Sequence, residues 1–246
     1  MKIACSSASF AQPLEAGELT QLEWLDACAN ELEVDGVVFE AAHFPREDGE
    51  YLAQLKKLAT DLGLTVAALA AEAVLGADCE RYLALAGALG APLAIARTPR
   101  AVEDPSAWGN FVDGVKHATR AAKRTNVTLA VLSARGTLCA DATDLGRLAK
   151  DVDSAWLRFG FDSSALGVTD DATPILEKAV IATHHIANLA RFATAADSEA
   201  AHLNASLARF RGFIVLEGAA DPGIATFHDA IERFAHYRAR SLTATP

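Results

Sequence analysis

One complete strand–helix–strand repeat lies in residues 37–69, VVFEAAHFPREDGEYLAQLKKLATDLGLTVAAL. The apolar run Val37–Phe39 predicts a buried strand, and the spacing of apolar residues over 48–61 predicts an amphipathic helix. Leu62-Gly63-Leu64 ends this helix with a glycine, which readily adopts the left-handed conformation needed there, and a second strand follows over Thr65–Leu69. This order of elements is typical of a β/α repeat with parallel strands.

The same alternation continues along the whole chain of 246 residues. The runs that predict strands are Ile3–Cys5, Val37–Phe39, Thr65–Leu69, Leu93–Ala96, Thr128–Leu132, Leu157–Phe161, Val180–His184 and Phe213–Leu216. Helices are predicted near 20–31, 48–61, 78–89, 105–124, 141–150, 171–178, 198–209 and 225–240. Because repeats of about 31 residues suit a closed α/β barrel, we predict one (β/α)8 TIM barrel domain over residues 1–246.

Two helix starts carry capping signals. Thr20-Gln21-Leu22-Glu23 has the pattern of a capping box, and Asp104-Pro105 offers an acceptor followed by a residue without an N–H group. An open doubly wound sheet is the alternative fold, but its usual glycine-rich first turn is replaced by Ser6-Ser7-Ala8-Ser9. Neither a G-x-G-x-x-G nor a P-loop motif occurs, which favours the barrel.

The composition is that of a globular protein with a large core, because 51% of the residues are hydrophobic and 22% are charged. The formal charge of −10 disfavours nucleic acid as a partner. The four cysteines are scattered singly, and the sequence contains neither a long apolar leader nor an apolar stretch of membrane-spanning length. We therefore expect a cytoplasmic protein with reduced thiols and no membrane partner; the oligomeric state is left open.

Chemistry in such barrels sits where the strands end, at their carboxyl termini. The polar residues at these ends are Ser6, Ser7, Glu40, His43, Glu72, Arg97, Arg135, Asp162, His184, His185 and Glu217. Asp162, one histidine of the pair and Glu217 follow three adjacent strands, and their O, N and O donors suit Mg²⁺, Mn²⁺ or Zn²⁺. The alternative is that the carboxylates cap helices and the histidines fill polar gaps at the rim.

The run Val37–Pro45, with the helix after it and Leu62-Gly63-Leu64, resembles the xylose isomerase-like family of sugar isomerases and epimerases. The resemblance covers essentially the whole chain and implies an eight-stranded TIM-type barrel that acts on a small carbohydrate or a sugar phosphate. It also implies a divalent metal held by Glu, Asp, His and Glu at the ends of strands 5, 6, 7 and 8. The two glutamates of that set often form the acid/base pair.

This sequence has a matching residue at three of the four metal-ligand positions. Asp162 in Phe161-Asp162-Ser163-Ser164 and Glu217 in Leu216-Glu217-Gly218 match the pattern. His185 best fits strand 7, although Ala187 stands where a lysine is expected and His184 remains an alternative. At strand 5 the ligand and base position is Leu132, which can neither coordinate a metal nor accept a proton.

Two hypotheses follow from this departure. In the first, Asp162, His185 and Glu217 hold Mn²⁺, Mg²⁺ or Zn²⁺ with water in the vacant place, and Glu217 and His185 are the catalytic residues of a one-base proton transfer beside a carbonyl. In the second, the site contains no metal: Arg97 or Arg135 pairs with Asp162 or Glu217, and the barrel binds a sugar phosphate or sugar acid, without turnover or with a chemistry of Glu217 that we do not specify. Alternatively, both arginines form solvated ion pairs at the rim of the barrel.

The resemblance and the strand ends together predict substrate-binding residues, namely His43, Glu40, Glu72, Arg97 and Arg135. A metal-dependent endonuclease on the same kind of barrel would require a basic groove and more histidine ligands, and neither is visible in the sequence.

Overall fold

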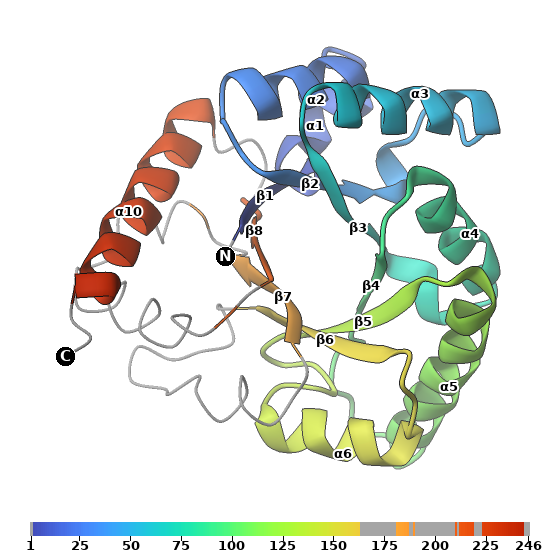
Figure 1. The fold of residues 1–246 in the computed structure, drawn as a ribbon. Coiled ribbons are helices and arrows are strands. Elements are labelled where there is room, and N and C mark those ends of the chain that lie inside the picture. The colour runs from blue at the N-terminus through green and yellow to red at the C-terminus, as the bar shows by residue number, and fades with distance from the viewer. Residues whose placement is uncertain are drawn as a thin grey trace.

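The computed structural model describes residues 2–162, 181–186, 189, 210, 212–218 and 223–243, with the backbone alone for 184 and 236–243. Within these ranges the strands form a closed parallel barrel in the order of the chain (Figure 1). The strands are β1 (Lys2–Ser6), β2 (Gly36–Glu40), β3 (Thr65–Ala71), β4 (Leu93–Arg97), β5 (Thr128–Ser133), β6 (Leu157–Asp162), β7 (Ile181–Ile186) and β8 (Phe213–Leu216). The predicted (β/α)8 barrel architecture is thereby confirmed.

Helices surround the ring of strands, as Figure 1 shows. They are α1 (Ala11–Ala16), α2 (Gln21–Asn30), α3 (Gly49–Asp61), α4 (Cys79–Leu89), α5 (Ala107–Thr125), α6 (Ala142–Val152) and α10 (Gly223–Thr243). Short 3₁₀ segments follow the first three strands: η1 (Ser7–Phe10), η2 (Ala41–His43) and η3 (Glu72–Leu75). The helices predicted at 171–178 and 198–209 lie outside the described residues. No helix in the described ranges is long and apolar enough to cross a membrane.

The local signals at the helix ends are mostly confirmed. Thr20 and Glu23 form the predicted capping box, with Thr20 Oγ1 accepting from the Glu23 N–H at 3.2 Å and Glu23 Oε2 accepting from the Thr20 N–H at 2.8 Å. Gly63 and Gly90 have left-handed φ values of 75° and 76°. The predicted start at Asp104-Pro105 is wrong: Asp104 accepts from the Ser106 N–H in a turn, and the helix begins at Ala107.

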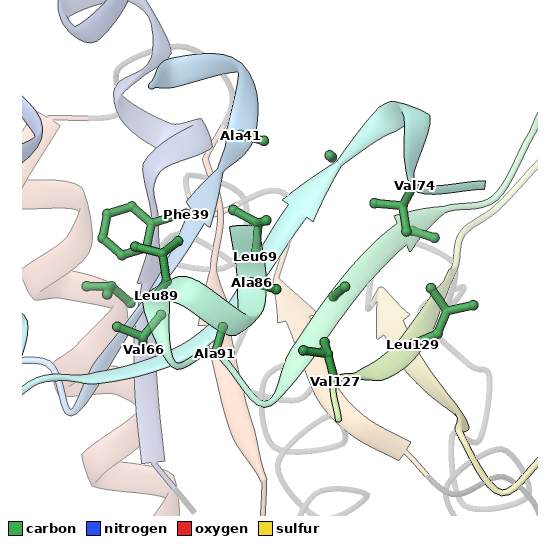
Figure 2. Close-up of a cluster of buried hydrophobic side chains, with 14 of the residues drawn as sticks. Phe39, Ala41, Val66, Leu69, Val74, Ala86, Leu89, Ala91, Val127 and Leu129 are labelled. Atoms are coloured by element: carbon green, nitrogen blue, oxygen red, sulfur yellow. The ribbon is translucent and has the colours of Figure 1, made fainter. Parts of the chain in front are cut away.

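The core has two layers. The larger layer lies between the strands and the helices, where Figure 2 shows Phe39, Leu69 and Leu89 packed together. The smaller layer fills the inside of the barrel and consists of Ala4, Val38, Ala67, Ala68, Ala70, Ile95, Ala130, Leu132 and Val215. Because most of these side chains are small and aliphatic, the barrel interior is a packed apolar floor beneath the strand ends.

Candidate functional site

Polar side chains are arranged directly above the apolar floor by the alternation of each strand, in which residues two apart face the same side. On four strands a floor or interior residue is followed two positions later by a polar one. These pairs are Val38 and Glu40, Ile95 and Arg97, Thr183 and His185, and Val215 and Glu217. Glu217 follows β8 directly and continues its pairing, because its N–H donates to the Ile186 carbonyl at 3.0 Å.

Arg97, at the end of β4, joins two carboxylates that come from β2 and β8, the two strands on either side of β1. Its Nη2 lies 2.6 Å from Glu40 Oε1 and 2.9 Å from Glu217 Oε1. The side chains of Glu40 and Glu217 are only 11% and 13% exposed, whereas that of Arg97 is 37% exposed. The Nε and Nη1 groups of Arg97 make no hydrogen bond with the part of the chain that the structure describes. One guanidinium therefore neutralises two largely buried acids and still has donors for a further oxygen.

His185 engages the other oxygen of Glu217. Its Nδ1 lies 3.2 Å from Glu217 Oε2, and its Nε2 lies 3.2 Å from Thr183 Oγ1. Because an ionised carboxylate only accepts, Nδ1 carries the proton, and in the neutral ring Nε2 accepts from the Thr183 hydroxyl. Both oxygens of Glu217 and both ring nitrogens of His185 are thus committed to partners within the protein.

The pKa values of Glu40 and Glu217 are shifted in opposite directions. Burial acts to raise the pKa of Glu217, but the hydrogen bond from His185 and the charge of Arg97 outweigh it and lower the pKa to about 2. Burial also raises the pKa of Glu40, and there the charge of Arg97 does not compensate, since the nearby charge of Glu217 adds to the rise. Burial acts to lower the pKa of Arg97, yet the two carboxylates raise it above its ordinary value. Arg97 therefore remains a permanent cation.

Two serines of the segment after β1 hold the backbone beside these glutamates. Ser7 Oγ accepts from the N–H of Glu40 at 2.8 Å, and Ser9 Oγ accepts from the N–H of Gly218 at 2.8 Å. Both serines are fully buried. The first turn, noted in the sequence for lacking glycine, thus anchors the strand ends that carry both acids.

His43 contacts this arrangement through Ser7. Its Nδ1 lies 3.0 Å from Ser7 Oγ, and its Nε2 lies 4.0 Å from a carboxylate oxygen of Glu15. Burial lowers the pKa of His43, while Glu15 acts in the opposite direction. Among the described residues its ring has no hydrogen bond to Arg97, Glu40 or Glu217, so His43 is connected to Glu40 only through Ser7.

The remaining predicted residues are distributed less closely. Asp162 ends β6, is 7% exposed and is the sheet partner of His185. Glu72, the first residue of η3, and Arg135, in the turn after β5, are both exposed. The structure brings neither of them into the described Arg97 cluster. The side chain of His184 and the residues Ser163 and Ser164 lie outside what the structure describes.

The residues present do not fit a divalent ion held by Asp162, His185 and Glu217. The donor atoms of Glu217 and His185 are committed as described above, and a guanidinium already lies at Glu217 Oε1. Leu132 is 5% exposed and belongs to the apolar floor, so it adds no ligand. Among the residues described, no group of three or more His, Cys, Asp or Glu side chains is placed to hold a metal ion.

The pairing of Glu40 with Arg97 and that of Thr183 with His185 were not predicted from the sequence. Alternation along a strand could have placed both side chains on the inward face, because Val38 predicts an inward Glu40 and His185 predicts an inward Thr183, but it does not give the partner of Glu40.

Comparisons with known proteins place the fold. No protein-family model matches the chain, and no curated protein sequence matches it. Among solved structures, a D-psicose 3-epimerase in the presence of D-fructose is 14% identical with a TM-score of 0.76, covering 97% of this chain and 99% of that one. An L-ribulose 3-epimerase is 17% identical with a TM-score of 0.74, covering 99% and 98%.

Two further solved structures of this fold are not named as sugar epimerases. The probable 3-DHS dehydratase AsbF from Bacillus anthracis is 12% identical with a TM-score of 0.77, covering 96% of this chain and 99% of that one. A fusion protein that contains a xylose isomerase-like TIM barrel and a 4-hydroxyphenylpyruvate dioxygenase is 16% identical with a TM-score of 0.71. The match covers 98% of this chain and 43% of the fusion protein. The chain therefore has the fold of the xylose isomerase-like TIM barrels, as the resemblance in its sequence implied.

Proposed function

We propose that the protein binds a small hydroxy-carbonyl sugar at the mouth of the barrel and isomerises it by moving a proton beside the carbonyl group. The observation that carries this proposal is the bridge from Arg97 to Glu40 and Glu217, which puts a permanent donor and two buried acids at the strand ends. Structures of the same fold that are named as sugar epimerases support the choice of a carbohydrate. These structures are 14% and 17% identical to this chain, so the choice of reaction rests on the geometry of the site.

The charges of the cluster favour an uncharged sugar over a sugar phosphate or a sugar acid. With both glutamates ionised, the single positive charge of Arg97 leaves a net charge of −1 among these three side chains. An anionic ligand would compete with two carboxylates for the same guanidinium and would be repelled by them. A polyhydroxylated, neutral ligand instead finds N–H donors on Arg97 and acceptor oxygens on the acids.

Glu40 is better placed than Glu217 to accept the proton. Only Oε1 of Glu40 bonds to Arg97, and its Oε2 has no hydrogen-bond partner in the described residues. The raised pKa of Glu40 makes it a stronger base than an ordinary glutamate, whereas the pKa of about 2 makes Glu217 a weak one. This proposal revises the expected role of Glu217 to that of holding Arg97 and His185.

The proton transfer balances with one base. Glu40 removes the proton from the carbon beside the carbonyl, and the electrons of that C–H bond form the double bond of an enediolate. The Nε and Nη1 groups of Arg97, which have no partner among the described residues, stabilise the charge that develops on the carbonyl oxygen. The neighbouring hydroxyl proton moves to that oxygen, and Glu40 returns its proton to the former carbonyl carbon. Because Leu132 supplies no second base, we favour isomerisation over inversion of a single centre.

A barrel that binds a sugar without turnover is the second candidate. It is favoured by one observation, the engagement of both carboxylate oxygens of Glu217 by Arg97 and His185, which makes this acid a poor base.

An experiment in deuterated water distinguishes the two candidate functions. The protein is incubated with neutral aldoses and ketoses and with their phosphates, while NMR follows ligand binding and deuterium incorporation beside the carbonyl. We expect binding and deuterium incorporation with a neutral sugar, and binding alone with a Glu40→Gln variant. Binding without exchange by the unaltered protein would establish the second candidate, and no binding of any sugar would contradict both.

A further inference from the structure

The most unusual feature of the mouth is that its central cation is part of the chain. Arg97 lies at the end of β4, and its guanidinium reaches acids at the end of β2 and directly after β8. The three elements are far apart in sequence, so the barrel itself brings these side chains together. Both contacts, at 2.6 Å and 2.9 Å, are short, as is typical of charge-assisted hydrogen bonds.

We propose that Arg97 serves as a built-in cation at the centre of the mouth, so that this barrel binds its ligand without a divalent metal ion. The identity of the ligand rests on the function proposed above, whereas the independence from metal is a property of Arg97 and its neighbours. The ligand class that fits is an oxygen-rich, uncharged molecule that accepts hydrogen bonds from a planar guanidinium.

Electrostatics oppose a metal at this position. A divalent ion that contacted Glu217 would lie close to the fixed positive charge of Arg97 and be repelled by it. Moving Arg97 aside would remove a hydrogen bond from each of two largely buried carboxylates, and such losses are costly in a partly desolvated site. The site therefore disfavours the ion both by direct repulsion and by the cost of rearrangement.

The wall beside Arg97 also lacks ligands. Leu132 is the direct Cα partner of Arg97 across β4 and β5, and its Cδ1 lies 2.9 Å from the position that a Cβ on Gly160 would take. This aliphatic side chain thus fills the space between neighbouring strands, and the residue at this strand position offers neither a carboxylate nor a histidine nitrogen. A metal at the mouth would face hydrocarbon on this side, where ions need oxygen, nitrogen or water.

The charge at the wall and the charge at the centre fit each other. A leucine at position 132 contributes no negative charge, and a guanidinium carries one positive charge where a metal ion would carry two. Compared with the four-ligand metal site that the sequence resemblance implies, this site has one acid fewer and one positive charge fewer. Its net charge is therefore unchanged. Leu132 and Arg97 are therefore better understood as a matched pair than as a metal site that has lost one ligand.

The test uses the full chain and needs no sugar. Metal content is measured after purification without chelator, and the melting temperature is measured with EDTA, Mn²⁺, Mg²⁺ or Zn²⁺ added. We expect substoichiometric metal and an unchanged melting temperature in each case. A stoichiometric ion, or a melting temperature that falls with EDTA, would overturn the proposal.

Variants at position 97 test whether Arg97 is the reason. Arg97→Met leaves two carboxylates without their cation, so Mn²⁺ should raise its melting temperature although it does not affect the parent protein. Arg97→Lys keeps a positive charge and should stay insensitive to Mn²⁺, which makes it the matched control. If Arg97→Met folds and shows no response to Mn²⁺, Arg97 is not what takes the place of the ion and the proposal is wrong.

If Arg97→Met does not fold, the measurements on the parent protein and on Arg97→Lys still decide. Failure of the deuterium exchange experiment would overturn the proposed isomerisation and leave these results untouched. Sugar turnover that is abolished by EDTA would overturn the proposed independence from metal and leave the proposed isomerisation in place.

Discussion

Gly160 and Leu132 are direct Cα partners on β6 and β5, and the glycine leaves the space that the leucine side chain fills. A Cβ on residue 160 would lie 2.9 Å from Leu132 Cδ1 and 3.0 Å from Thr183 Oγ1. Contacts this short are not tolerated without movement of a neighbour. Because Thr183 also bonds His185, the packing at Gly160 is connected to the polar cluster above the floor.

We expect Gly160→Ala to lower the free energy of unfolding by about 1–3 kcal/mol, since the added methyl group overpacks the barrel interior. Chemical denaturation of the purified variant measures the change. In a Gly160→Ala/Leu132→Ala double variant the space left by the leucine accepts the new methyl group, so the loss should be smaller than the sum of the two single losses. Strict additivity would contradict the described contact.

Leu132→Ala is expected to cost about 2–5 kcal/mol of unfolding free energy, because it opens a cavity in the apolar floor. Leu132→Met keeps most of the volume and should cost less than about 1.5 kcal/mol. Denaturant titrations of both variants provide the comparison. Equal losses for alanine and methionine would mean that Leu132 does not fill the floor.

Ser7→Ala should weaken the support of Glu40. The substitution removes the acceptor of the Glu40 N–H and a neighbour of His43, and a buried donor left without a partner costs about 1–3 kcal/mol. Ser9→Ala is the matched control, because it removes the equivalent contact beside Glu217, at the Gly218 N–H. We expect similar losses of stability for the two variants but a loss of proton transfer mainly for Ser7→Ala. Equal effects on proton transfer would contradict the special role of Glu40.

Most of the fold could be predicted from local patterns. The apolar runs located every strand to within two residues, because a buried parallel strand must be almost continuously apolar. The short helix at Ala11–Ala16 and the 3₁₀ segments were missed, since pieces of a few residues carry too little periodicity and depend on their tertiary contacts. The start of the helix after Asp104 was misplaced because the Asp104 side chain stabilises a turn instead.

The site could be predicted only in part. Arg97 and Glu217 were predicted to lie at strand ends, with their pairing as one alternative, and the structure supports this pairing. The second partner, Glu40, was also expected at the mouth, but its pairing with Arg97 was not predicted, because a position at a strand end does not determine which side chains meet. Which long side chain reaches across a barrel mouth depends on closure and register, and a register shift occurs between Val37 and Val38 beside this very strand end. Neither is encoded in a local pattern.

The opposite pKa shifts of the two glutamates predict opposite effects of pH on stability. For Glu217 the pKa in the folded state is about 2, below its ordinary value of 4.5, so its ionisation stabilises the fold above pH 4.5. This contribution is lost as the pH falls toward 2, and at about 1.4 kcal/mol for each pKa unit it is on the order of 3–4 kcal/mol. For Glu40 the folded pKa is raised, so its contribution is present at low pH and declines as the pH rises through that value.

Glu217→Gln and Glu40→Gln variants separate the two contributions. Unfolding free energies are measured between about pH 3 and pH 8, where a shift in either glutamate changes the slope of stability against pH. We expect Glu217→Gln to lose most stability relative to the parent above pH 4.5 and least near the acid end. Glu40→Gln should do the opposite, losing least at high pH because a neutral amide removes the cost of a buried charge. If both variants change stability with pH in the same direction, Arg97 does not divide its charge between the two acids in the way described.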